Sequence, residues 1–139
     1  MAENTKLVID ASIVMSWLLA DEHDDRVVVL IEECIAKRAL MFAPQIITYE
    51  VVNGLKTSIV RNRVSLGLAK KLLDDFDQLH LQIISDMDLH QLIELSVAHN
   101  ISVYDGEYAS LAQNLNAPLC TKDQKLANKI SPKVKCLVF

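Results

Sequence analysis

Four acidic residues are the positions in this 139-residue chain where chemistry is most plausible: Asp10, Glu50, Asp105 and Asp123. The chain has eighteen Asp and Glu residues, so most of them must be ordinary surface charge. If these four carboxylates converge, each pair about 4 Å apart repels by ~4 kcal/mol at an effective dielectric of about 20, and a divalent cation resolves that repulsion. All-oxygen ligands favour Mg²⁺ or Mn²⁺ over zinc. The residue types therefore predict a metal site suited to phosphodiester hydrolysis by activated water.

Short apolar runs alternate with helical patterns along the whole chain. We expect strands at about 6–9, 40–43, 81–84, 101–104, 118–121 and 134–138. We expect helices at about 12–18, 24–38, 45–62, 65–79, 89–99, 105–116 and 124–130. Strands that alternate with helices predict an α/β fold, in which a mostly parallel sheet is covered by helices on both faces.

Three of the four acids, Asp10, Asp105 and Asp123, lie at or just past the ends of expected strands. Functional groups of parallel sheets gather at the carboxyl ends of the strands, so these three side chains should meet at one edge. The amino terminus of a helix also lies next to each of them and favours the ionised carboxylate. This coincidence of position is the main sequence argument for a shared site.

Glu50 is assigned to the site for a different reason. It falls on the helix expected at 45–62, next to Ile46, Ile47 and Val51. An acid within an apolar helical face is unusual unless it is paired or bound to a metal. A half-exposed charge is the alternative interpretation for this residue.

The acidic cluster at 21–25 also contains a histidine, His23, but it falls between two expected helices without the fixed spacing that positions ligands. We interpret it as a solvated turn.

Composition and charge limit the classes of protein that fit. A hydrophobic content of 51% and a charged content of 23% are ordinary for a globular protein, and we expect one domain over 1–139. The longest aliphatic run, 27–31, is far shorter than a membrane span of roughly 20 residues. The first six residues lack the basic start and long apolar centre of a secretory signal. We therefore expect a soluble, cytoplasmic protein.

Basic residues are unevenly distributed, although the net charge of −4 does not by itself indicate a nucleic-acid binder. One group lies between 51 and 73, and the other lies in the last eighteen residues: Lys56, Arg61, Arg63, Lys70 and Lys71, then Lys122, Lys125, Lys129, Lys133 and Lys135. A basic rim around an acidic pocket can hold a phosphate backbone. A solvated basic helix face is the alternative.

Four short stretches carry the acids, at 8–12, 47–53, 103–112 and 119–123. The most specific pattern is Tyr-Asp-x-x-Tyr-Ala-x-x-Ala around Asp105, followed by Thr-x-Asp, with Asp123 eighteen residues after Asp105. In these motifs and their order, the chain resembles the PIN domain family, and specifically the VapC-type toxin ribonucleases of prokaryotic toxin–antitoxin pairs. The resemblance covers nearly the whole chain.

This resemblance implies a three-layer α/β/α sandwich around a mostly parallel, five-stranded sheet, with the whole chain as a single PIN domain. It implies RNA cleavage that depends on Mg²⁺ or Mn²⁺. It also implies a homodimer and an antitoxin partner whose tail enters the acidic groove.

The resemblance also implies roles for individual residues. Asp10, Glu50, Asp105 and Asp123 fall on the acidic, metal-binding positions of the family. Ser12 and Thr121 fall where the family often has a small hydroxyl that supports the site. Asn53, one helical turn after Glu50, is a further candidate for such support, or else a plain polar helix position.

One local departure from the family pattern follows Asp105, where related chains commonly carry small residues and this chain has Gly106 and Glu107. Glu107 adds a fifth acid near the site, and the sequence does not determine which way it faces. Tyr108 we expect to pack against the sheet.

Two other classes of protein fit part of the pattern. Receivers and haloacid-dehalogenase-like phosphatases also place an aspartate after the first strand. The receiver pattern requires an acid immediately before it, where this chain has Ile9, and the phosphatase pattern requires Asp-x-Asp, where position 12 is Ser12. A catalytically silent, PIN-like binding module stays open, although the four intact acids weigh against it.

Overall fold

The computed structural model describes residues 5–139, so the part of the amino terminus at 1–4 that entered the argument about a secretory signal lies outside the described residues. The elements are, in chain order, β1 (Thr5–Ile9), α1 (Ala11–Leu18), the 3-10 helix η1 (Ala20–Glu22), α2 (Asp25–Ile35), β2 (Ala39–Pro44), α3 (Ile46–Val60), α4 (Leu66–Asp77), β3 (Gln82–Ile84), α5 (Leu89–His99), α6 (Val103–Leu115), β4 (Leu119–Thr121), α7 (Gln124–Ile130) and β5 (Cys136–Val138). Across the described range, no helix has both the length and the apolar character needed to cross a bilayer.

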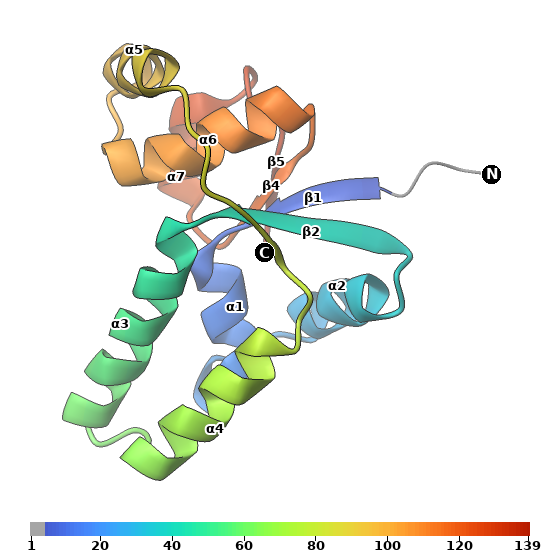
Figure 1. Cartoon of the computed structure of the whole chain (residues 1–139), viewed down its shortest axis with the longest axis vertical. Coiled ribbons are helices and arrows are strands. Elements are labelled where there is room, and N and C mark those ends of the chain that lie inside the picture. Colours follow the sequence, from blue (N-terminus) through green and yellow to red (C-terminus); the bar gives the residue numbers. More distant parts are fainter. Residues whose placement is uncertain (1–4) are drawn as a thin grey trace.

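The five strands form one sheet in the order β3-β2-β1-β4-β5, and all four neighbouring pairs are parallel. Helices α1 to α4 lie on one side of the sheet, and α5 to α7 lie on the other (Figure 1). The two edge strands, β3 and β5, are three residues long. This arrangement confirms the predicted α/β/α sandwich with a parallel, five-stranded sheet.

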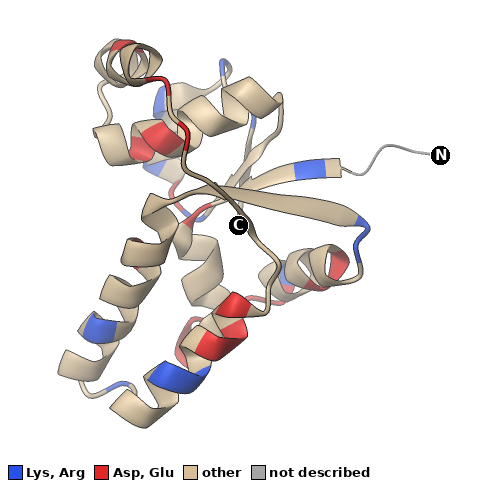
Figure 2. Ribbon diagram, in the orientation of Figure 1, with Lys and Arg blue, Asp and Glu red and all other residues tan. Residues whose placement is uncertain are grey.

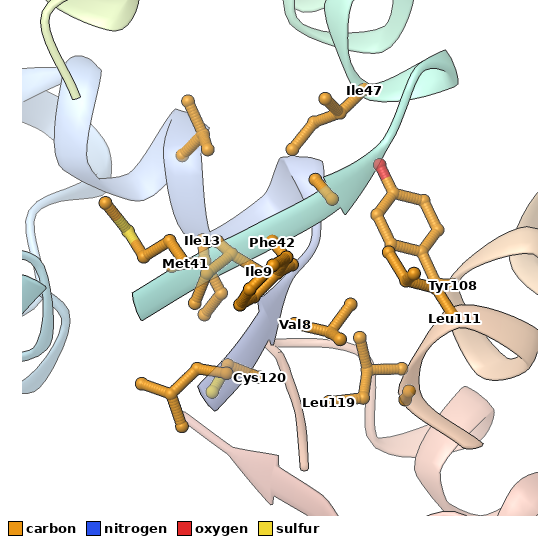
Figure 3. Close-up of a cluster of buried hydrophobic side chains, with 14 of the residues drawn as sticks. Val8, Ile9, Ile13, Met41, Phe42, Ile47, Tyr108, Leu111, Leu119 and Cys120 are labelled. Carbon is orange, nitrogen blue, oxygen red and sulfur yellow. The ribbon is translucent and has the colours of Figure 1, made fainter. Parts of the chain in front are cut away.

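The core lies on both faces of the two central strands. Val8, Ile9 and Leu119 have no exposed surface. Side chains of α1, α3 and α6 gather with them in one cluster (Figure 3). Strands buried on both faces need continuous apolar runs rather than alternation, which explains why the sequence shows short, fully apolar segments.

Six helices of the described chain begin at a side-chain cap, in which an oxygen accepts a hydrogen bond from a backbone N–H of the first turn. The capping residues are Asp10, Asp24, Ser65, Asp88, Ser102 and Asp123. Two of them, Asp10 and Asp123, also follow a strand directly or within two residues. Their positions are therefore fixed from both sides, by the sheet and by the helix that they start.

The strand expected at 101–104 is wrong, because α6 already begins at Val103. Ser102 starts this helix, since its hydroxyl accepts a hydrogen bond of 3.0 Å from the backbone N–H of Asp105. The apolar side chains that suggested a strand are exposed, Val103 to 44% and Tyr104 to 59%. Asp105 therefore reaches the edge of the sheet in the first turn of a helix and does not follow a strand.

Gly106 allows α6 to approach α5 closely. It is buried, and a Cβ placed there would overlap the Ser96 hydroxyl and lie 3.1 Å from Cδ1 of Leu92. Any side chain at this position would push the start of α6 away from α5. The glycine therefore sets the position of the neighbouring Asp105.

We predict that Gly106→Ala lowers the free energy of unfolding by about 1–3 kcal/mol, because overpacking outweighs the better helix propensity of alanine. Urea unfolding would measure the loss. The double variant Ser96→Ala/Gly106→Ala should recover most of it, because Cβ of residue 96 is an ordinary 3.6 Å away once the hydroxyl is gone. Ser96→Ala alone is the matched control. A single Gly106→Ala variant as stable as the native chain would contradict this packing argument.

Candidate active site

Asp10 is the most enclosed acid of the site, with 8% of its surface exposed. Its Oδ1 accepts hydrogen bonds from the Ser12 hydroxyl at 2.5 Å and from the backbone N–H of Ile13 at 3.2 Å, and its Oδ2 accepts one from the Thr121 hydroxyl. Burial raises the pKa of Asp10 above its ordinary value, although the hydrogen bonds lower it. Both carboxylate oxygens are therefore held in fixed directions.

Thr121 and Ser12 join the two segments that leave β4 and β1. The Thr121 hydroxyl accepts a hydrogen bond of 3.0 Å from the backbone N–H of Asp123, and the Ser12 hydroxyl accepts one of 2.9 Å from the backbone N–H of Lys122. Each hydroxyl thus donates to Asp10 and accepts from a backbone N–H of the segment that leaves β4. These hydrogen bonds link Asp10 to the segment after β4, and the supporting role expected for both residues stays a prediction.

Glu50 lies on α3 and is half-buried. Its Oε1 accepts a hydrogen bond of 2.6 Å from the Tyr108 hydroxyl on α6. Burial raises the pKa of Glu50 most, and the negative charges of Asp10, Asp105 and Glu107 raise it further, while Tyr108 lowers it. The acids therefore lie close enough to affect one another's ionisation.

Tyr108 is a contact that the sequence argument missed. It packs in the core as expected, with 2% of its surface exposed, and its hydroxyl also reaches Glu50. Figure 3 shows its ring beside Leu111 and its hydroxyl at the far end of the ring from α6. A buried tyrosine usually needs a polar partner, and Tyr108 follows Asp105 by three residues on one helix face. A tyrosine expected in the core, three residues after a site acid, was the sequence signal that could have predicted this contact.

Asp105 and Asp123 line one small cavity of about 240 Å³, and two lysines, Lys125 and Lys129, border it with them. Burial raises the pKa of Asp105, and the charge of Asp123 raises it further. At Asp105, and also at Asp10, burial opposes the ionised form that the neighbouring helix amino terminus favours. The lysines agree with the basic rim predicted around an acidic pocket.

Glu107 contributes a fifth carboxylate to the site. Its charge raises the pKa of Glu50, so the two acids are close. One of its oxygens, Oε2, is buried without a hydrogen-bond partner in the described part of the chain. A buried carboxylate oxygen without a donor is costly unless a cation or a water satisfies it.

These acids have the chemistry of a Mg²⁺ or Mn²⁺ site, because the donors are all carboxylate oxygens and one buried oxygen has no partner. As positioned, however, no three Asp, Glu, His or Cys side chains among residues 5–139 are gathered as a metal site requires. Protein donors engage two of the acids instead: Tyr108 holds Glu50, and two hydroxyls hold Asp10. Asn53 is exposed on α3, and its supporting role stays a prediction.

The cluster at 21–25 is more than the solvated turn that the sequence suggested. Asp24 accepts hydrogen bonds from Arg26 and from Lys122, and Asp21 accepts two bonds of 2.8 Å from Arg63. These contacts lower the pKa of Asp24, with the bond from Arg26 as the largest cause. The cluster therefore holds basic side chains beside the site.

The sequence matches the PIN domain family over residues 7–130, and the chain belongs to this family. Ribonuclease VapC3 of Pyrobaculum aerophilum is 25% identical over 128 residues, which cover 89% of this chain and 94% of the relative. Ribonuclease VapC1 of Mycobacterium tuberculosis is 31% identical over 104 residues, which cover 72% of this chain and 74% of the relative.

The fold is also that of a solved structure. The crystal structure of VapBC2 from Rickettsia felis, bound to a DNA fragment from their promoter, matches with a TM-score of 0.74 over 97% of this chain and 99% of that chain. At 20% identity this likeness concerns the fold alone.

We predict that Thr121→Val lowers the free energy of unfolding by about 1–3 kcal/mol, because it leaves an oxygen of the buried Asp10 and the backbone N–H of Asp123 without a partner. Thr121→Ser keeps the hydroxyl and should lose less. Chemical denaturation of the three proteins at neutral pH would measure the difference. Equal losses in the two variants would show that the hydroxyl does not support the site.

Proposed function

We propose that this chain is an endoribonuclease that hydrolyses RNA phosphodiester bonds with Mg²⁺ or Mn²⁺, and that it is the toxin of a VapBC-type toxin–antitoxin pair. The observation that carries the proposal is the group of acids at the carboxyl edge of the sheet, in which Asp10, Asp105 and Glu107 all raise the pKa of Glu50. Membership of the PIN domain family and relatives named as ribonucleases support it.

We assign the metal to Asp10, Glu50, Asp105 and Asp123, with Glu107 as a neighbouring charge. When bound, such an ion makes water more acidic and offsets the charge that develops on phosphate oxygens. The assignment is supported by the all-oxygen donor set and by the electrostatic strain among these acids.

The chain's own residues supply position and charge in this proposal. Ser12 and Thr121 hold both oxygens of Asp10, and Tyr108 holds one oxygen of Glu50, so neither carboxylate turns freely. Lys125 and Lys129 border the cavity of Asp105 and Asp123, where they can contact a phosphate of the RNA backbone. In this proposal Lys125 and Lys129 bind the RNA backbone, and the four acids hold the metal.

We further propose that the chain works in the cytoplasm as a single PIN domain over 1–139, forms a homodimer and is controlled by an antitoxin. The antitoxin's tail would enter the acidic groove and place an arginine on the carboxylates, since arginine and carboxylate pair with two parallel hydrogen bonds. Similarity to the fold of VapBC2 supports an antitoxin partner.

RNA cleavage tests the proposed reaction. Native chain with Mg²⁺ or Mn²⁺ should cut RNA, whereas Asp10→Asn and Asp105→Asn, each with native-like unfolding, should lower the rate about a hundredfold, because even an outer-shell partner of a metal ligand contributes about 10- to 100-fold. Gel or sequencing readouts of a mixed RNA pool would measure this. Cleavage that survives both substitutions would mean that the assignment is wrong. A native chain that cuts nothing would favour a silent binding module.

Metal binding gives a second test that is independent of turnover. At about ten times its dissociation constant, Mn²⁺ should stabilise the native chain by about 1.4 kcal/mol. The double variant Asp10→Asn/Asp105→Asn should gain much less, because it lacks two of the four charges. Thermal unfolding in MnCl₂, against NaCl of equal ionic strength, would measure both gains. The same gain in both proteins would place the metal elsewhere.

A further inference from the structure

A second cavity opens beside the acidic site, between α1 and α3. It encloses about 540 Å³, which is within the range of small-molecule sites in proteins. Ser12, whose hydroxyl donates to Asp10, lines it, and so does Lys122, which follows Thr121 in the chain. The cavity therefore begins where the acidic site ends.

The two helices give the cavity its direction. The lining residues Ser12 and Met15 on α1, and Leu19 directly after its last residue, follow one another at helical spacing. On α3, Gly54 and Thr57 lie four and seven residues after Glu50, on the same helix face. The cavity thus leads away from the acids along α1 for about 10 Å, which is the rise of seven helical residues.

The floor of the cavity is apolar and adaptable. Met15 and Leu19 contribute aliphatic surface, and Gly54 leaves room for Met15, since a Cβ at residue 54 would lie 2.8 Å from the Met15 Cε and 3.0 Å from its Sδ. A thioether makes favourable contacts with aromatic rings and adjusts its shape to them. A flat heterocycle is therefore a suitable occupant.

The mouth of the cavity carries charges of both signs, because Glu22 lines it together with the two cations Lys122 and Arg63. Lys122 lies at the end near the acids and Arg63 lines the cavity from the α3–α4 connection. Figure 2 shows further Lys and Arg positions along the end of α3, this connection and the start of α4. Arg63 pairs with Asp21 and Glu22, and Lys122 pairs with Asp24. Ion pairs this close to water are worth little, so a phosphate can share or replace them.

We propose that this cavity binds one nucleotide of single-stranded RNA next to the scissile phosphate. Its base lies on Met15 and Leu19, and its phosphate groups lie towards Lys122 and Arg63. The inference rests on the proposed function, and it adds a binding site that selects the base beside the cut. The two cations at the mouth, Lys122 and Arg63, are the partners that this phosphate-bearing ligand needs.

The test measures binding without turnover. Two-dimensional ¹⁵N NMR of the full chain in EDTA, titrated with each of the four nucleoside 5′-monophosphates and with inorganic phosphate, reports affinity and the amides that shift. At least one nucleotide should bind about tenfold more tightly than phosphate, as burial of a base against apolar side chains provides. The shifted amides should include Thr57 and Met15.

Matched variants of α3 locate the binding. Thr57→Phe fills the cavity and should reduce nucleotide affinity to that of phosphate, whereas Val60→Phe, at a position 66% exposed on the same helix, should leave it unchanged. If Thr57→Phe does not fold, Gly54→Ala serves instead, because residue 54 lines the cavity and its Cβ would overlap the Met15 side chain of the floor. Nucleotides that bind no better than phosphate, or equal binding by the filled variant and the Val60→Phe control, would overturn the proposal.

The two proposals fail separately. Nucleotide binding in EDTA needs neither the metal nor cleavage, so it can hold even if Asp10→Asn cuts RNA normally and the assigned reaction is wrong. Conversely, loss of cleavage in Asp10→Asn together with no preference for nucleotides over phosphate would keep the proposed ribonuclease and remove this base-binding site.

Discussion

The register of β1 against β4 is the constraint on which the site depends. Val8 pairs with Leu119 and Ile9 with Cys120, so the next residues along, Asp10 and Thr121, arrive at the edge together. The hydroxyl of one then meets the carboxylate of the other. In a sheet, a slip of one residue turns every side chain to the opposite face, so this contact exists in one register only. The apolar runs that bury the central strands also select that register.

The close approach of these acids costs electrostatic free energy, which the rest of the fold must offset. Burial and neighbouring charge raise the pKa of Glu50 and of Asp105, which means that their ionised forms are disfavoured where they stand. Hydrogen bonds offset part of this cost for Asp10, and they leave Oε2 of Glu107 with no donor in the described chain. Such strain is usual where a protein keeps charges together for binding or catalysis.

Much of this could be predicted from sequence, although not always for the right reason. Asp10 and Asp123 could be predicted from the sequence because each lies close after a buried strand and starts a helix, and these two local signals agree. Asp105 was chosen by its motif and does share a cavity with Asp123, yet its supposed strand does not exist, because a serine cap can start a helix within a short apolar run. Tyr108 was placed only in the core, since its bond to Glu50 joins residues 58 positions apart and depends on how two helices pack. Contacts of that kind are not encoded in local spacing.

The hydrogen bond between Tyr108 and Glu50 affects the order in which parts of the molecule unfold. It connects α6, on one side of the sheet, with α3, on the other, at the edge where the acids lie (Figure 1). Local unfolding of either helix would break it and release Glu50, even while the central strands stay protected from hydrogen exchange. The carboxylates would then separate before the sheet does. The acidic site therefore stays intact only while the less stable of the two helical layers stays folded. A partner that contacts both layers would stabilise both and so preserve the site.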